Sequence, residues 1–115
     1  MSTGFENLDV WKLSARLSVD IYKHFSHCND FGFKDQITRS SLSIPSNIAE
    51  GNDRSSNKDN VKFLFYAKGS CAELRTQIYI GSEIGYIEGP LSKVLIQETI
   101  KISKMLTKLI SSLRE

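Results

Sequence analysis

The chain has 115 residues, of which 40% are hydrophobic and 24% charged, and its formal net charge is +2. This composition is typical of one globular domain and excludes a disordered chain or a membrane protein, because no apolar run approaches the ~20 residues of a membrane span. The small net charge permits a nucleic-acid partner without requiring one.

The N-terminal segment, MSTGFENLDVW, has no basic stretch followed by an apolar core, so we expect no secretory signal and a cytoplasmic location. In the cytoplasm Cys28 and Cys71 are expected to be reduced thiols. We expect residues 1–115 to form a single domain that needs neither a disulfide nor a metal.

A first helix is predicted from about Asn7 to Phe25. Apolar positions cover most of its circumference: Leu8, Val10, Trp11, Leu13, Ala15, Leu17, Ser18, Ile21 and Tyr22. The charged residues form one narrow strip: Asp9, Lys12, Arg16, Asp20 and Lys23. Such a wide apolar surface is more than one neighbouring helix usually covers. The polar segment Ser26–Gly32 is expected to end this helix as a turn.

A second helix is predicted from about Phe33 to Glu50. Helical spacing gives it a polar stripe on one side: Gln36, Arg39, Ser43, Asn47 and Glu50. The opposite side carries a mostly apolar seam: Phe33, Ile37, Ser40, Ser41, Ile44 and Ile48. This pattern predicts that one face packs into the fold and the other meets a partner.

The same helix contains an internal proline and is followed by a glycine. Pro45 removes a backbone hydrogen bond and crowds the carbonyl of Ser41, so the sequence predicts a kink near Ser41 or two shorter helices. Gly51 is predicted to be a left-handed C-cap residue.

A third helix is predicted after the polar loop Asn52–Ser55, with Ser56 as its N-cap and Asp59 completing a capping box. Its core seam is expected at Leu64, Ala67, Cys71, Leu74, Ile78 and Gly85. A second apolar stripe consists of Val61, Phe65, Ala72 and Tyr79. This second stripe is hard to explain in a monomer.

A fourth helix is predicted to begin at Gly89 and Pro90, because proline fits the first helical turn. Its inner seam is expected at Leu95, Thr99, Ile102, Leu106, Leu109 and Leu113. A basic outer face carries Lys93, Gln97, Lys101, Lys104 and Lys108. Three further apolar residues lie on a flank beside the seam: Ile96, Ile100 and Ile110.

These elements predict an all-α fold, with an antiparallel up-down-up-down four-helix bundle as the simplest topology. The apolar residues left outside the seams favour a symmetric homo-oligomer over a monomer with a broad core.

Two groups of residues invite a chemical interpretation. His24, His27 and Cys28 could contribute to a zinc site, but no second cluster completes a tetrahedron and a solvated helix end explains them better. Glu50 and Glu73 could act as acid and base, but pairing with arginines explains them better. No glycine loop with phosphate-binding spacing is present either. From these observations together we expect no metal, no cofactor and no catalytic residue.

Basic residues provide the candidate nucleic-acid contacts, and a solvated surface is the alternative interpretation. The candidate contacts are Lys93, Lys101, Lys104 and Lys108, together with Arg54 and Lys58. Several copies arranged in a ring would multiply their positive field and hold a phosphate backbone through avidity.

Three segments resemble a known family: FENLDVW, then QITRSSLSIPSNIAEGNDR, then FLFYAKGSCAELRTQIYIGSEIGYI. They are similar to bacterial 23S rRNA-intervening-sequence proteins, and to the accessory variability determinants of diversity-generating retroelements, which bind a reverse transcriptase and nucleic acid. The most specific match is SIPSNIAEG with Arg39 and Arg54 on either side, followed by Gly69, Ser70 and Glu73 in a GS-x-x-E pattern.

The resemblance implies an antiparallel four-helix bundle that assembles as a ring-shaped homopentamer. It favours a non-catalytic module that binds RNA, DNA or a ribonucleoprotein, with a protein–protein scaffold as the alternative and an enzyme third. The signature polar set is Arg39, Asn47, Glu50, Arg54, Ser70 and Glu73. We expect these residues to form a buried or interfacial network, and direct ligand contact is the other interpretation.

Overall fold

The computed structural model describes residues 4–115 and contains four α-helices after a short 3-10 turn. The turn, η1, spans Phe5–Asn7, and the helices are α1 (Asp9–His24), α2 (Phe31–Asn52), α3 (Asn57–Glu83) and α4 (Gly89–Arg114). Because residues 4–115 contain no strand, the predicted all-α fold with four helices is confirmed. Residues 1–3, which the predicted domain includes, lie outside the described part of the chain.

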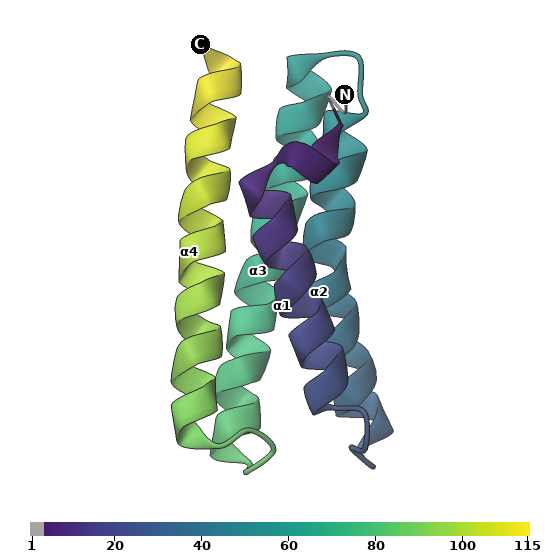
Figure 1. Cartoon of the computed structure of the whole chain (residues 1–115), viewed down its shortest axis with the longest axis vertical. Coiled ribbons are helices and arrows are strands. Elements are labelled where there is room, and N and C mark those ends of the chain that lie inside the picture. The colour runs from purple at the N-terminus through teal and green to yellow at the C-terminus, as the bar shows by residue number, and fades with distance from the viewer. Residues whose placement is uncertain (1–3) are drawn as a thin grey trace.

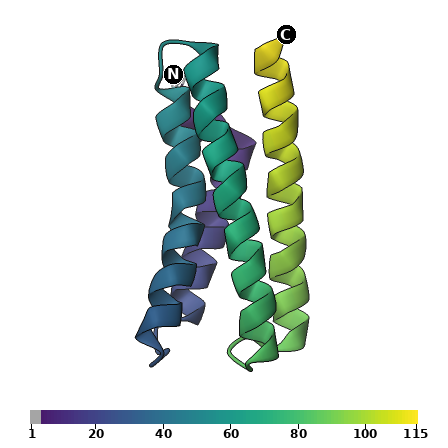
Figure 2. The same cartoon turned by 180° about the vertical axis from the view of Figure 1, so that it is seen from behind.

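The four helices lie side by side in an elongated molecule of 43 × 24 × 21 Å (Figure 1). α3 packs against α2 and α4, and α1 also packs against α2 and α4. The η1 turn, the C-terminus and the α2–α3 connection lie at one end of the molecule (Figures 1 and 2). The α1–α2 and α3–α4 connections lie at the opposite end.

The core forms where the apolar faces of the four helices meet. The predicted seam of α3 is buried at Leu64, Ala67, Cys71, Leu74 and Ile78. α1 contributes Leu17 and Ile21, α2 contributes Ile37, Ile44 and Ile48, and α4 contributes Leu95, Ile102 and Leu106. Burying these side chains supplies the main driving force for folding, at about 25 cal/mol for each Å² of apolar surface removed from water.

Several polar side chains are buried between helices and are hydrogen-bonded there. The Ser18 and Ser41 hydroxyls lie 3.1 Å apart between α1 and α2. Ser40 of α2 donates to the side-chain carbonyl of Gln77 on α3. The apolar periodicity did not predict that Gln77 is buried. Glutamine side chains are mostly exposed, and a buried one needs a hydrogen-bond partner.

α2 continues through Pro45 as one helix, so the alternative of two shorter helices is wrong. Its axis changes direction near its middle (Figure 2), as expected where proline removes a backbone donor. The hydroxyls of Thr38, Ser40 and Ser41 also donate to carbonyls in the preceding turn, a contact that bends helices.

Gly51 does not cap α2, because it lies inside the helix and has no positive φ. It is buried, and a Cβ built on it would lie 2.8 Å from the Cβ of Phe63 and 3.0 Å from the backbone oxygen of Asn60. Gly51 is therefore a point of close approach between α2 and α3. The predicted helix end at Glu50 is thus two residues early, and the predicted start at Phe33 is late, since Asp30 caps the helix by accepting from the Phe33 amide.

The glycine with a positive φ is Gly85, which ends α3 and does not belong to its core seam. The amide of Tyr86 donates to the carbonyl of Gly81 at 2.8 Å, and the amide of Gly85 donates to that of Ser82 at 3.2 Å, the two bonds of a Schellman motif. The buried seam position is Gly81. The predicted Ser56 cap and the Pro90 start are confirmed.

Two residues assigned to exposed stripes are buried within the monomer. Val61 of α3 and Ile110 of α4 belong to the core, with 8% and 4% of their surface exposed. Phe65, Ala72 and Tyr79, the rest of the second α3 stripe, are exposed.

Candidate functional site

Part of the signature polar set forms a chain of hydrogen bonds between α2 and α3. The Asn47 amide donates to the Ser43 carbonyl at 2.8 Å and to the Ser43 hydroxyl at 3.0 Å. The Ser70 hydroxyl on α3 donates to the same Ser43 hydroxyl at 3.0 Å. All three side chains are half-buried. Ser43 is thus the centre of this chain, although the signature set omits it.

The charged members of the set do not join that chain. Arg39 pairs with Asp35 at 2.9 Å and Arg54 pairs with Glu50 at 3.2 Å, each one turn away on α2. Glu73 is exposed on α3. Within one protomer the six residues therefore do not form a single buried network, and an interfacial network between copies stays a prediction. Exposed pairs of this kind contribute little to stability, because solvent screens them.

The lysines proposed as nucleic-acid contacts are all exposed. Lys93, Lys101, Lys104 and Lys108 lie on α4, and Lys58 lies in the first turn of α3. The two ion pairs found within residues 4–115 involve none of these lysines, so their charges are available to solvent or to a ligand. Arg54 is half-exposed, with its guanidinium 4.6 Å from the centre of the Phe63 ring in addition to the Glu50 contact.

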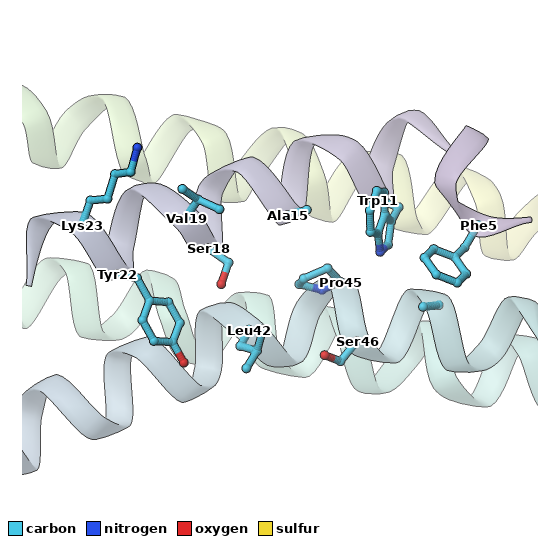
Figure 3. Close-up of a pocket in the computed structure, with 11 residues that line it drawn as sticks. Phe5, Trp11, Ala15, Ser18, Val19, Tyr22, Lys23, Leu42, Pro45 and Ser46 are labelled. Atoms are coloured by element: carbon cyan, nitrogen blue, oxygen red, sulfur yellow. The ribbon is translucent and has the colours of Figure 1, made fainter. Parts of the chain in front are cut away.

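An apolar groove of about 520 Å³ runs between α1 and α2. Trp11 of α1 and Leu42 and Pro45 of α2 line it, and Phe5 and Tyr22 lie toward its opposite ends (Figure 3). Val19, Tyr22 and Leu42 are exposed although they are apolar or aromatic. We call this surface the α1–α2 groove. Among the residues that line the groove, only Lys23, at one end, is charged.

The His24, His27 and Cys28 cluster forms a structural corner. His24 Nε2 lies 2.9 Å from the Tyr86 carbonyl, and the Tyr86 hydroxyl donates to Asp30 at 2.8 Å. Within residues 4–115 no three His, Cys, Asp or Glu side chains are grouped so as to hold a metal ion. The contacts instead connect the α1–α2 turn to the α3–α4 turn.

Asp30 gives this corner a dependence on pH. The Phe33 amide and the Tyr86 hydroxyl both donate to its carboxylate and lower its pKa below 3.8. A lowered folded pKa stabilises the protein above the unfolded value, and the stabilisation is lost as the pH falls through the folded pKa. We expect the Asp30→Asn variant to be less stable at neutral pH, by a margin that shrinks below about pH 4. Urea unfolding midpoints across pH measure this.

Tyr86→Phe provides the comparison, because it removes one donor and leaves the helix cap. The pH-dependent loss of stability in Tyr86→Phe should be smaller than that in Asp30→Asn. If Asp30→Asn were less stable than the unmodified protein by the same amount at every pH, the Asp30 carboxylate would not be the source of the pH dependence.

The candidate catalytic pair also lacks a suitable environment. Glu50 and Glu73 are both exposed, and Glu50 is paired with Arg54. The Cys71 thiol is buried, 3.1 Å from the Thr99 carbonyl, and burial raises its pKa. A thiol with a raised pKa is a poor nucleophile at neutral pH.

Residues 6–108, nearly the whole chain, match the model of a family described as 23S rRNA-intervening sequence protein. The chain belongs to this family. The family assignment from the SIPSNIAEG and GS-x-x-E residues is therefore confirmed. No curated protein matches the chain.

One solved structure is similar over most of this family member. It is the crystal structure of a protein with unknown function from the S23 ribosomal protein family of Bacteroides thetaiotaomicron. The sequence identity is 26%, the TM-score is 0.82, and the match covers 88% of this chain and 97% of the other. None of the helices in residues 4–115 is both long enough and apolar enough to cross a membrane.

Proposed function

We propose that this family member is a non-catalytic homo-oligomeric bundle that binds RNA or a ribonucleoprotein. The observation that carries the proposal is the face of α4 formed by Lys93, Lys101, Lys104 and Lys108, which are exposed and unpaired within residues 4–115. Lysines without an ion-pair partner can bind the phosphate groups of a nucleic acid. The family name, which refers to 23S rRNA, makes RNA the first nucleic acid to test.

A ring-shaped assembly of up-down-up-down bundles, with the pentamer that the resemblance implies, explains the exposed apolar residues. A ring requires two different surfaces on each copy, because its interfaces are head-to-tail. The α1–α2 groove provides one surface. The other is an α3 end patch of three exposed residues: Tyr79, Ile80 and Ile84. We propose that the groove of one copy receives the α3 end patch of the next.

A scaffold that assembles without touching nucleic acid is the second candidate. The apolar character of the α1–α2 groove supports it, because this surface suits another protein segment better than a phosphate backbone. The two candidates differ in their response to salt, since binding that depends on phosphate contacts weakens as salt rises.

The lysine face is tested by removing its charge. We expect Lys101→Gln/Lys104→Gln/Lys108→Gln to weaken binding of a structured RNA at low salt. The log–log dependence of affinity on salt should also become shallower, by about 0.7 to 0.9 for each phosphate that the variant no longer neutralises. Fluorescence anisotropy measures both quantities.

A control removes two exposed charges from α1 outside the α1–α2 groove, as Lys12→Gln/Arg16→Gln. Equal losses of affinity in the two variants would indicate a general charge effect without a defined face. If the unmodified protein binds no RNA at low salt, the scaffold function is favoured.

A further inference from the structure

A second basic surface lies where the start of α3 meets the end of α4. A hollow of about 610 Å³ opens there, and its walls include Lys58, Lys62, Phe65 and Arg114. Phe65 and the neighbouring Tyr66 are 44% and 49% exposed. We call Lys58, Lys62, Phe65, Tyr66 and Arg114 the aromatic-basic end. Phe65 lines the hollow, whereas Tyr66 is next to it in the sequence, and neither half-exposed ring belongs to the core.

Cations lie over the aromatic rings of this surface. The Arg114 guanidinium carbon is 5.1 Å from the centre of the Phe65 ring, and the Lys62 amine is 6.0 Å from that of Tyr66. Phe63 meets Tyr66 edge to face at 5.5 Å, which holds the Tyr66 ring in position. The surface therefore presents two aromatic rings, the guanidinium plane of Arg114 and the amines of Lys58 and Lys62.

This arrangement matches the requirements of a single-stranded nucleic acid. Unpaired bases stack on aromatic rings and on arginine planes, while lysines contact the phosphates between them. Phe65 and Tyr66 are consecutive on a helix, so their side chains diverge by about 100° and suit two separate bases. A duplex would gain little here, because its bases are already stacked within the helix.

Charge alone does not explain the surface. Asp59 also lines the hollow and offsets part of its positive charge. Lys58, Lys62 and Arg114 have no ion-pair partner within residues 4–115. The balance favours a ligand that gains affinity from stacking as well as from phosphate contacts, in contrast to the purely basic face of α4.

We propose that the aromatic-basic end binds single-stranded nucleic acid by stacking unpaired bases on Phe65 and Tyr66. Lys58, Lys62 and Arg114 contact the adjoining backbone. This inference rests on the proposed nucleic-acid-binding function and assigns a specific site and strand preference to it.

The test uses a short single-stranded RNA that contains a fluorescent adenine analogue whose emission is quenched on stacking. The full-length protein should quench the emission on binding. Phe65→Leu and Tyr66→Leu should each weaken binding about 5- to 100-fold and reduce the quenching. Phe65→Tyr and Tyr66→Phe keep an aromatic ring and should retain both signals. Phe31→Leu, at an exposed ring at the start of α2 and outside every proposed surface, is the control.

The outcomes separate this site from the general function. Loss of single-strand binding in the two leucine variants, with thermal unfolding unchanged, supports the site. If RNA binds but only the α4 lysine variant weakens it, the function stands and the aromatic-basic end is overturned. If neither single-stranded nor structured RNA binds at low salt, both proposals are overturned. Thermal unfolding of each variant distinguishes a binding defect from an unfolded protein.

Discussion

Alanine at Gly51 is expected to destabilise the protein, whereas alanine at Gly69 is expected to stabilise it. Both glycines lie inside helices, where alanine is intrinsically preferred by about 1 kcal/mol. At Gly51 a new Cβ would lie 2.8 Å from the Cβ of Phe63 and 3.0 Å from the Asn60 backbone oxygen. Neither atom can move without shifting α3.

The balance of these effects decides the sign at Gly51. Overpacking of this kind costs about 1–3 kcal/mol, which exceeds or cancels the helix-propensity gain. At Gly69 no atom outside its own helical turn lies within 4 Å, so only the propensity gain remains. Because the propensity gain is common to both variants, urea unfolding should give free energies of unfolding that differ by roughly 1–3 kcal/mol, the overpacking cost. A stabilised Gly51→Ala would disprove the close approach of α2 and α3.

Gly51 also shows why helix ends were harder to predict than helices. The core residues Leu64, Cys71 and Leu74 were identified because their spacing is a local property of one helix. A glycine after an apolar run has two explanations, a left-handed cap or a close helix crossing, and only the position of the second helix decides between them. Gly85 shows the reverse case, since it ends α3 although its spacing fits the seam.

The candidate site depended still more on distant parts of the chain. The sequence pattern identified Asn47 and Ser70 as polar residues of interest, but their connection through Ser43 depends on the register between α2 and α3. Arg39 and Arg54 found acidic partners one turn away on their own helix, which a search for i,i+4 pairs would have found. The pairing of Arg75 with Thr99 of α4, at 3.0 Å, has no local signal.

Single glutamate substitutions on the two apolar surfaces are expected to convert the assembly into monomers. Leu42 in the α1–α2 groove and Ile80 in the α3 end patch are 48% and 47% exposed, so Leu42→Glu and Ile80→Glu should leave the fold of the monomer intact. Burying an unpaired carboxylate at an interface costs several kcal/mol, enough to dissociate it at micromolar concentration. Light scattering after size exclusion measures the mass.

A mixture of the two variants tests the head-to-tail arrangement. The Leu42→Glu protein keeps an intact α3 end patch and the Ile80→Glu protein keeps an intact groove, so one functional interface can form between them. Because the remaining surfaces are blocked, we expect the mixture to give a heterodimer of twice the monomer mass and no ring. If the interface instead joined the grooves of two copies, the mixture would give no heterodimer, because the groove of the Leu42→Glu partner is blocked. Val94→Glu, at an exposed position on α4 outside both surfaces, should keep the assembly of the unmodified protein. A monomeric unmodified protein would overturn the oligomer and leave the α1–α2 groove to a different partner.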